Sequence, residues 1–349
     1  MTSLPSELPE SIESEDMLDE VLTRPQPELI DFMRTLSGPL VILGAGGKMG
    51  PTLSVLARRA ADAAGASCEI IAVSRFSDAQ SRRWLEERGV KTLSADLLDR
   101  SSLAGLPDAS NVIYLVGLKF GTQDNPARTW AVNTLVPSYV AERYPGARIA
   151  ALSTGGVYPL VPVAGSGSRE ADALVPPGEY ANSCIGRERI FEFYSRTNAT
   201  PVTLVRLSYA VELRYGVLID IARRVYAGEP VDVTMGYLPY IWQGEANAMV
   251  IRSLGLADSP PVPLNLTTSP PLKVRDVAQQ LGELMGRPAV IVGEEAPSAL
   301  WSNTERLETA LGRPSVTLET MLRWTADWIM RGGRLLGKPT HFEVRDGAY

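Results

Sequence analysis

The chain of 349 residues is 45% hydrophobic and 21% charged, which is typical of a globular protein with an extensive core. Its formal net charge is −6, yet residues 1–31 alone carry −8 from nine acidic residues and Arg24, which leaves +2 for the remainder. A near-neutral body without a basic cluster argues against nucleic acid as the main partner.

Cysteine, histidine and apolar content narrow the class further. Cys68 and Cys184 cannot form a disulfide framework, and the single histidine, His341, cannot anchor a histidine-based metal site. No apolar run approaches the roughly 20 residues of a membrane span, and the acidic start lacks signal-peptide character. We therefore expect a cytoplasmic protein without a membrane partner.

Residues 1–38 are predicted to form an acidic N-terminal arm. Two short helices are expected in it, at residues 14–22 and 28–36, separated by the helix-breaking run Arg24-Pro25-Gln26-Pro27. The charge of this arm favours a solvated segment that packs on the body of the protein or on a neighbouring subunit.

The body begins with a strand, a glycine-rich turn and a helix. Residues 39–43 predict a short buried strand, Gly44-x-x-Gly47-x-x-Gly50 follows, and residues 51–64 predict a helix. Glycines in such a turn let the backbone approach a diphosphate, whose charge is met by N–H groups and by the helix N-terminus. The motif carries weight when further strand–helix units follow it.

Such units follow. Strands are predicted at residues 69–73, 91–95, 111–116, 147–152 and 202–207, and helices at 77–88, 126–144 and 179–196. Ser77 is expected to cap the first of these helices, and Pro137 to kink the second. The alternation predicts an α/β fold, with a Rossmann-type doubly wound parallel sheet over residues 39–208. Residues 209–349, where short strands such as 262–266 mix with helices, predict mainly a smaller C-terminal α/β substrate lobe and C-terminal helices.

Polar motifs stand at the ends of the predicted strands. They are Asp96-Leu97, Val116-Gly117-Leu118-Lys119, Ser153-Thr154-Gly155-Gly156 and Arg206-Leu207-Ser208-Tyr209. Asn133 lies in the helix after the fourth strand, and Tyr180 lies 26 residues after Thr154. Over roughly residues 39–330, this series resembles the extended short-chain dehydrogenase/reductase family, which holds nucleotide-sugar epimerases, dehydratases and reductases.

The resemblance implies a dinucleotide site and a catalytic pair. The cofactor-binding residues would be Gly44, Gly47, Lys48, Met49, Gly50, Ser74, Arg75, Asp96, Leu97, Val116, Gly117, Lys119 and Asn133. Tyr180 would exchange a proton with a substrate hydroxyl while hydride passes to the nicotinamide, and Thr154 would hydrogen-bond the same oxygen. Candidate substrate contacts are Tyr209, Arg214 and Gln243.

One position departs from the family pattern Tyr-x-x-x-Lys, because Cys184 stands four residues after Tyr180. A phenol's ordinary pKa of about 10 is too high for a base at neutral pH, so a nearby cation must lower it. Arg187, on the same helix face, and Lys119 are the candidate replacements. Alternatively, catalysis is weak or lost, or Cys184 acts as a nucleophile, which is the least favoured hypothesis because no base accompanies it.

The end of the second strand bears on the choice of cofactor. A carboxylate there would select NAD, whereas this chain has Ser74-Arg75, and a hydroxyl with a guanidinium suits a 2′-phosphate. The sequence therefore favours NADP over NAD.

The residues after Thr154 bear on the reaction. Dehydratases of the family carry Asp-Glu there, whereas this chain has Gly155-Gly156. We therefore expect an epimerase that acts through a transient keto intermediate on a nucleotide sugar, a sugar or a sugar acid. The alternatives are an NADP-dependent carbonyl reductase and a non-catalytic dinucleotide-binding or sensor protein. The resemblance also implies a homodimer joined through the helices near residues 126–144 and 180–196.

Overall fold

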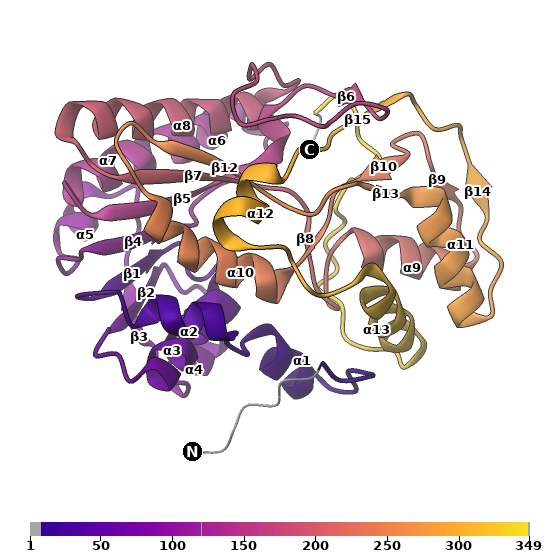
Figure 1. The fold of residues 1–349 in the computed structure, drawn as a ribbon, viewed down its shortest axis with the longest axis horizontal. Coiled ribbons are helices and arrows are strands. Elements are labelled where there is room, and N and C mark those ends of the chain that lie inside the picture. The colour runs from indigo at the N-terminus through magenta and orange to yellow at the C-terminus, as the bar shows by residue number, and fades with distance from the viewer. Residues whose placement is uncertain (1–7, 120, 348–349) are drawn as a thin grey trace.

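The computed structural model describes residues 8–119 and 121–347, and its centre is a seven-stranded parallel sheet (Figure 1). The strand order is β12-β7-β5-β4-β1-β2-β3, which confirms the predicted doubly wound α/β fold. The strands are β1 (Leu40–Leu43), β2 (Ile70–Ser74), β3 (Lys91–Ser94), β4 (Asn111–Tyr114), β5 (Arg148–Thr154), β7 (Val202–Leu207) and β12 (Val262–Leu266). The order reverses between β1 and β4, and ligands of such sheets bind in the crevice at the carboxyl ends of the strands beside this point.

Helices cover both faces of the sheet, so the central strands are apolar throughout rather than alternating. All four residues of β1 and all four of β4 are buried. One face packs against α2 (Pro27–Met33), α3 (Gly50–Ala64), α4 (Ala79–Glu86) and α10 (Gln243–Arg252). The other packs against α5 (Arg100–Ala104), α7 (Val136–Arg143) and α8 (Glu179–Asn198). The helix α6 (Pro126–Trp130) and the π-helix η1 (Ala131–Leu135) pack on α8.

Two local expectations need correction. Asp78, and not Ser77, caps α4, because its carboxylate accepts from the backbone N–H groups of Gln80 and Ser81. The irregularity expected at Pro137 lies in the turn before it, where η1 separates α6 from α7. Proline has no N–H to donate to the carbonyl four residues earlier, so a wider π turn at this place is a physically reasonable adjustment.

After β5 the chain forms short elements and a second helical layer. These elements are η2 (Gly155–Val157), β6 (Val161–Pro162), β8 (Ala210–Val211), α9 (Val217–Ala227), β9 (Val231–Asp232), β10 (Tyr237–Leu238), β11 (Ile241–Trp242), η3 (Ser253–Leu256), β13 (Leu272–Lys273), α11 (Val274–Met285), β14 (Ile291–Val292), β15 (Ser298–Ala299), α12 (Glu305–Leu311) and α13 (Leu318–Met330). Helices α9, α11 and α13 share one apolar core, which lies beside the sheet in Figure 1. None of the helices in the described ranges combines the length and apolarity of a membrane span.

The position of residues 262–266 in the sequence suggested a strand of the C-terminal lobe. This expectation is wrong. The strand forms β12 and extends the central sheet beside β7, while α10 packs on α3. A short apolar run does not reveal which of two sheets it will join, because both offer it a buried edge.

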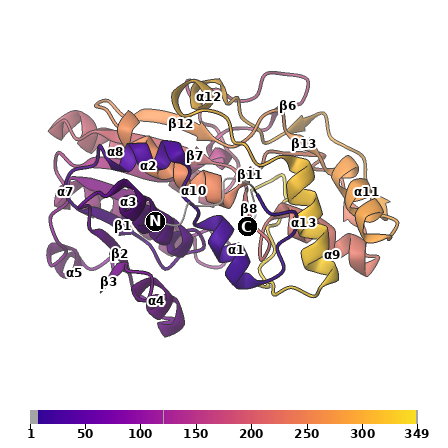
Figure 2. The ribbon, with the colours of Figure 1, turned by 60° about the horizontal axis from the view of Figure 1, so that its bottom comes forward.

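The acidic arm lies across both parts of the molecule (Figure 2). In α1 (Glu15–Leu22), Leu18 and Leu22 are fully buried in the core of α9 and α13, whereas Leu29 of α2 is buried against the sheet domain. The guanidinium of Arg59 on α3 donates to the Glu20 carboxylate at 3.2 Å. The arm is therefore packed on the body of its own chain through apolar side chains as well as charges.

Candidate functional site

Two adjoining cavities lie at the carboxyl ends of the strands. The first, here called the long cleft, has a volume of about 770 Å³ and is lined by the ends of β1, β2, β3 and β4. The second, here called the inner pocket, has a volume of about 320 Å³ and is lined by the end of β5, the start of α8 and the lobe. Both cavities are lined by Gly44, Gly47, Lys48, Leu115, Lys119 and Tyr215. A ligand in the long cleft can therefore extend into the inner pocket.

The glycine loop between β1 and α3 requires glycine at several positions. Gly44 has a φ of +85°, and a Cβ on Gly46 would lie 2.5 Å from the Ser74 hydroxyl oxygen. A Cβ on Gly50 would collide with the backbone of Ala45. Side chains here would collide with β2, with the chain after β4 or with the loop itself. Glycine therefore permits a compact loop of exposed backbone, which suits a diphosphate.

The far end of the long cleft is lined by Ser74, Arg75, Asp96 and Leu97, four of the residues that the sequence offers as cofactor contacts. Arg75 is exposed, and its guanidinium has no hydrogen-bond or ion-pair partner among residues 8–119 and 121–347. The Asp96 carboxylate accepts from the N–H of Leu98, so it stabilises its own turn. This end of the cleft thus offers an unpaired cation to a ligand.

The loop after β4 is fixed by Asn133 of η1. The Asn133 side chain accepts from the N–H of Leu118 at 3.0 Å and donates to the carbonyl of Leu118 at 3.1 Å. Arg187 donates to the same Asn133 oxygen at 2.7 Å and to the carbonyl of Leu152 at 2.9 Å. A Cβ on Gly117 would lie 2.7 Å from the Arg187 guanidinium, so the loop and the arginine are in close contact.

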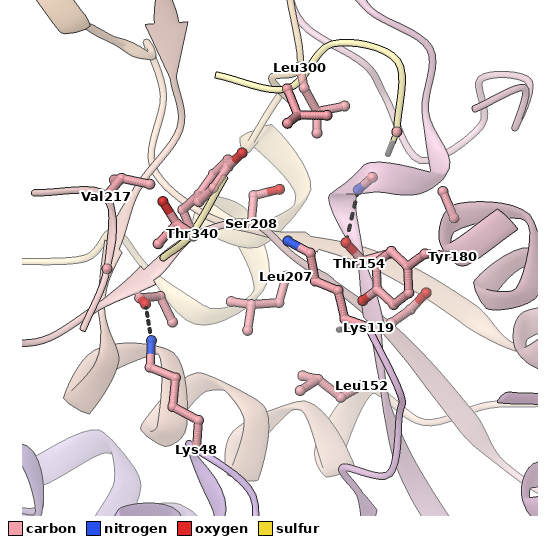
Figure 3. A pocket seen from close by; sticks show the side chains of 18 of the residues that line it. Lys48, Lys119, Leu152, Thr154, Tyr180, Leu207, Ser208, Val217, Leu300 and Thr340 are labelled. Atoms are coloured by element: carbon pink, nitrogen blue, oxygen red, sulfur yellow. Dashed lines mark hydrogen bonds between the residues drawn. The ribbon is translucent and has the colours of Figure 1, made fainter. Parts of the chain in front are cut away.

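Thr154 and Tyr180 meet at the inner pocket (Figure 3), although β5 and α8 are separated by a long loop. The Thr154 hydroxyl oxygen accepts from the N–H of Gly156 at 3.0 Å. That bond leaves the hydroxyl proton of Thr154 able to donate to a ligand. Tyr180 is the second residue of α8, which begins directly after Gly178, whose φ of +81° sets the entry into the helix.

Lys119 brings a positive charge to this pair. Its ammonium lies 5.9 Å from the centre of the Tyr180 ring. Burial lowers the pKa of Lys119 to about 8, and a smaller electrostatic contribution from Cys184 opposes the shift. Of the two cations that the sequence offered in place of the missing lysine, Lys119 lines the pocket, whereas Arg187 lies behind it in the hydrogen bonds to Asn133 and Leu152.

Cys184 is fully buried and packs with Val157 and Tyr158. Burial raises the pKa of its thiol, and Arg187 and Tyr180 oppose that rise. A buried, protonated thiol that lines neither cavity is unsuited to act as a nucleophile.

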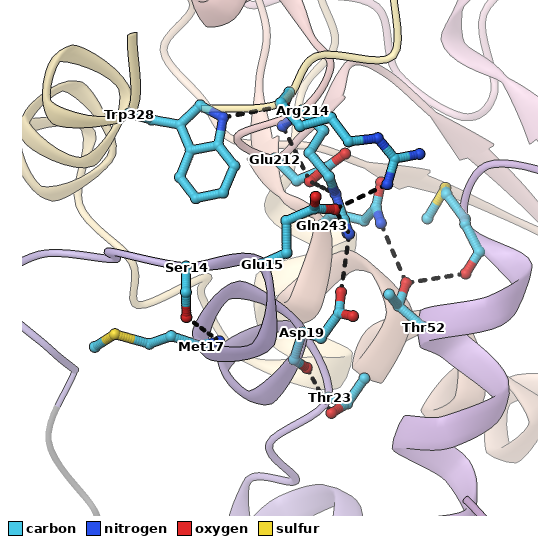
Figure 4. A network of polar contacts seen from close by, with 12 residues as sticks. Ser14, Glu15, Met17, Asp19, Thr23, Thr52, Glu212, Arg214, Gln243 and Trp328 are labelled. Atoms are coloured by element: carbon cyan, nitrogen blue, oxygen red, sulfur yellow. Dashed lines mark hydrogen bonds and ion pairs between the residues drawn. The ribbon is translucent and has the colours of Figure 1, made fainter. Parts of the chain in front are cut away.

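Two predicted substrate contacts lie elsewhere. The guanidinium of Arg214 pairs with Glu212 and with Asp19 of the N-terminal arm, each at 3.0 Å (Figure 4). Gln243 is 1% exposed and donates to the Thr52 hydroxyl at 3.2 Å. Neither lines the two cavities, whereas Tyr209, the third candidate, lines the inner pocket. The sequence could not reveal the partner of Arg214, because Asp19 is distant in the chain and lies in a segment without a family motif.

The glycine loop is expected to bind a ligand through its backbone, but the structure shows that Lys48 also contributes its side chain to the site. As a residue it is exposed to the cavities, but its ammonium donates to the carbonyl of Ala210 at 2.8 Å and lies 3.8 Å from the centre of the Tyr215 ring. Burial of that ammonium lowers the pKa of Lys48 to about 7, and Glu212 and Asp220 oppose the shift. A cation thus stands between the two cavities.

Sequence reasoning missed the lining residues that come from the end of the chain. Leu336 and Lys338 line the long cleft, and Thr340, Val344, Arg345 and Gly347 line the inner pocket. No motif marks them, and only the fold of the lobe returns this segment to the site. No group of three or more histidine, cysteine or acidic side chains that could hold a metal ion occurs within the described ranges.

No protein-family model and no curated protein matches this sequence. Solved structures, however, are similar to it. The UDP-glucose 4-epimerase of Thermus thermophilus, in complex with NAD, has a TM-score of 0.67 and 18% identity and covers 83% of this chain and 98% of its own. The dTDP-glucose 4,6-dehydratase of Bacillus anthracis, also with NAD, has a TM-score of 0.72 and 14% identity, and the match covers 84% of this chain and 97% of the dehydratase. The UDP-glucuronic acid 4-epimerase of Bacillus cereus has a TM-score of 0.70 and 15% identity, and the match covers 84% of this chain and 99% of that epimerase. The fold that the motifs led us to expect is thereby confirmed.

The buried contacts of Arg187 predict a measurable loss of stability. Arg187→Met removes the donors to Asn133 and Leu152, and we expect it to lower the free energy of unfolding by about 1–3 kcal/mol. Arg189→Met, on the exposed side of the same helix, is the matched control and should change it by less than about 0.5 kcal/mol. Urea denaturation of both variants measures the difference, and equal midpoints would show that the Arg187 contacts do not stabilise the fold.

Proposed function

We propose that the protein is an NAD(P)-dependent oxidoreductase acting on a sugar-type substrate, and that it works as an epimerase through a transient keto intermediate. The observation that carries this proposal is the junction of the two cavities. A cradle of glycine backbone lines one of them, and Thr154 and Tyr180 line the other. The similar structures that were solved with NAD, among them a UDP-glucose 4-epimerase, support the same assignment.

The residues of the long cleft fit a dinucleotide. Gly44, Gly46 and Gly47 would hold the diphosphate, and Asp96 with Leu97 would contact the adenosine end. Gly117 and Lys119, fixed through Asn133, would lie beside the nicotinamide end. When bound, the nicotinamide supplies the acceptor and donor of hydride.

Proton transfer falls to Tyr180 and Thr154. In the forward direction, the phenolate of Tyr180 takes the proton of the substrate hydroxyl, and the Thr154 hydroxyl donates a hydrogen bond to the same oxygen. The nearby ammonium of Lys119 favours the phenolate over the neutral phenol by simple charge attraction. We therefore assign to Lys119 the electrostatic role of the absent lysine, and to Arg187 the positioning of the loop that carries Lys119.

The glycines after Thr154 favour epimerisation or reduction over dehydration. A Cβ on Gly155 would collide with the Ser208 hydroxyl, so an acidic side chain at that position would require Ser208 to move. Elimination of water would need an additional acid and base. Between the two remaining reactions, an epimerase regenerates its bound cofactor, whereas a carbonyl reductase, our alternative, consumes NADPH in equal amount to product. The third candidate, a non-catalytic dinucleotide-binding or sensor protein, is supported by Cys184 alone.

We also propose a cytoplasmic homodimer. Both cysteines are free thiols, which suits a reducing compartment. Along the helices that the family resemblance singles out, Trp130, Leu135 and Phe193 are 37%, 45% and 59% exposed. Sedimentation velocity tests the dimer, and a monomer at micromolar concentration would contradict it.

Replacing the proposed base tests the function directly. Tyr180→Phe should lower turnover by about 10²- to 10⁴-fold, because proton transfer loses its general base while the long cleft is unchanged. The measurement is product formation, followed by NMR, with sugars, sugar acids and nucleotide sugars, together with the dissociation constant of the cofactor. Tyr194→Phe, a surface tyrosine of the same helix, serves as the control. Undiminished turnover in Tyr180→Phe would exclude Tyr180 as the base.

The pKa of Lys119 predicts an alkaline limit to activity. Since this pKa is lowered to about 8, the ammonium loses its proton as the pH rises through that value, and kcat/KM should fall there. Lys119→Arg should move this alkaline fall in kcat/KM to higher pH, because a guanidinium stays protonated. Lys119→Met should lower kcat/KM at every pH. If kcat/KM of Lys119→Arg still falls near pH 8, a group other than Lys119 causes that fall.

Arg75 predicts a preference for NADP. Its unpaired guanidinium can pair with a 2′-phosphate, and a charged hydrogen bond of about 1.5–3 kcal/mol corresponds to roughly 10- to 100-fold in affinity. Calorimetric titration with both cofactors should show NADP binding more tightly, and Arg75→Gln should remove the difference. Arg83→Gln, on the exposed side of α4, should retain it. Tighter binding of NAD by the unaltered protein would refute the preference.

A further inference from the structure

The last described residues form a strap across the site. Residues 335–347, here called the C-terminal strap, follow α13 and return to the two cavities. Leu336 and Lys338 line the long cleft, and Thr340, Val344, Arg345 and Gly347 line the inner pocket. In Figure 3, Thr340 stands near Val217, on the side of the pocket away from Tyr180. The strap therefore forms a wall of the inner pocket opposite the catalytic pair.

The strap is held in place by contacts along its length. The backbone N–H and the hydroxyl of Thr340 both donate to the Asp220 carboxylate, at 2.7 and 2.6 Å. Phe342 is fully buried in the core of the lobe. Arg345 donates to the carbonyl and the hydroxyl of Ser298, at 2.8 and 2.9 Å. These contacts make the strap a fixed part of the fold.

The end of the strap packs against the turn that precedes Tyr180. A Cβ on Gly347 would lie 2.5 Å from the carbonyl oxygen of Pro177, and a Cβ on Gly178 would lie 2.5 Å from the carbonyl oxygen of Gly347. Both glycines have positive φ, +76° and +81°. A side chain at position 347 would therefore push the strap away from the start of α8 and open the pocket on that side.

The closed strap limits the size of the ligand. The inner pocket, at about 320 Å³, is at the lower end of the range of about 300–1,000 Å³ for small-molecule sites. Part of this space must also admit the nicotinamide if hydride is to reach a substrate beside Tyr180. A nucleotide sugar adds a nucleoside and a diphosphate to the sugar ring, and a pocket of about 320 Å³ cannot enclose all of these together with the nicotinamide.

The charge of the pocket limits the chemistry of the ligand. Among the described residues that line it, three have basic side chains, Lys48, Lys119 and Arg345, and none is aspartate or glutamate. Lys48 and Lys119 also face the long cleft, where a diphosphate would engage them. Arg345 lines the inner pocket but not the long cleft. Its guanidinium has five N–H donors, and the contacts with Ser298 and the Met235 sulfur use only three of them.

We propose that the C-terminal strap is a specificity element that admits a free, monosaccharide-sized sugar acid and excludes nucleotide-linked sugars, with Arg345 as the ligand of the substrate carboxylate. The proposal rests on the proposed function for the identity of the reaction. The class of substrate, however, follows from the volume and charge of the inner pocket.

Binding measurements separate this proposal from the reaction itself. The full-length protein, saturated with NADP, is titrated calorimetrically with glucuronate, glucose and UDP-glucuronate, and turnover of each is followed in parallel. We expect glucuronate to bind at least tenfold more tightly than glucose, and UDP-glucuronate not to bind. Binding of glucuronate without turnover would support the strap and contradict the proposed function. Tighter binding of UDP-glucuronate than of glucuronate would overturn the strap while the proposed function stands.

Two variants test the residues involved. Arg345→Met should abolish the preference for glucuronate over glucose, whereas Arg331→Met, at the end of α13 and outside both cavities, should retain it. Gly347→Val should open the pocket and permit UDP-glucuronate to bind. Gly332→Val is the matched control, because Gly332 also has a positive φ, of +69°, but has no neighbour within 4 Å of an added Cβ. Unchanged selectivity in both Arg345→Met and Gly347→Val would refute the proposal.

Discussion

The guanidinium of Arg187 holds the site together. From a buried position on α8 it donates to Asn133 of η1 and to the carbonyl of Leu152 on β5, and Asn133 in turn fixes the backbone of Leu118. The helix that carries Tyr180, the strand that ends in Thr154 and the loop that carries Lys119 are thus joined through one side chain. Because a buried charge requires such partners, the three elements cannot shift independently without leaving it unsatisfied.

The irregular turn η1 gives Asn133 this position. A regular helix through Pro137 would leave the carbonyl of Asn133 without its usual N–H donor, and the π turn lies at this place. The Asn133 amide also donates to the Ser183 hydroxyl, which binds the carbonyl of Tyr180. The π turn is therefore linked by hydrogen bonds to the helix that carries Tyr180. Such turns are frequent at functional sites.

The sequence predicted what depends on local pattern, and failed where distant segments meet. Six of the seven strands of the central sheet and the proximity of Thr154 to Tyr180 follow from apolar runs and from motif order. The role of Arg214 could not be predicted, because its carboxylate partner Asp19 comes from the N-terminal arm. Likewise β12 joins the central sheet, and the C-terminal strap enters the site, only because the lobe folds back. Tertiary packing alone brings such segments together, so no window of sequence contains the information.

The surroundings of Cys184 explain why this position does not hold the lysine of the family pattern. The thiol is fully buried against Val157 and Tyr158, one turn before the buried guanidinium of Arg187. A lysine there would bury a second cation beside the first, with Glu188 already engaged by Arg206 at 2.7 Å. The desolvation of two like charges would cost more than one carboxylate that already pairs with Arg206 returns. This chain instead places its positive charge on the loop after β4, at Lys119, and uses the interior of α8 to fix that loop. The positive charge and the side chains that position it thus lie on different elements, and the position of Lys119 depends on the hydrogen bonds of Asn133 and Arg187.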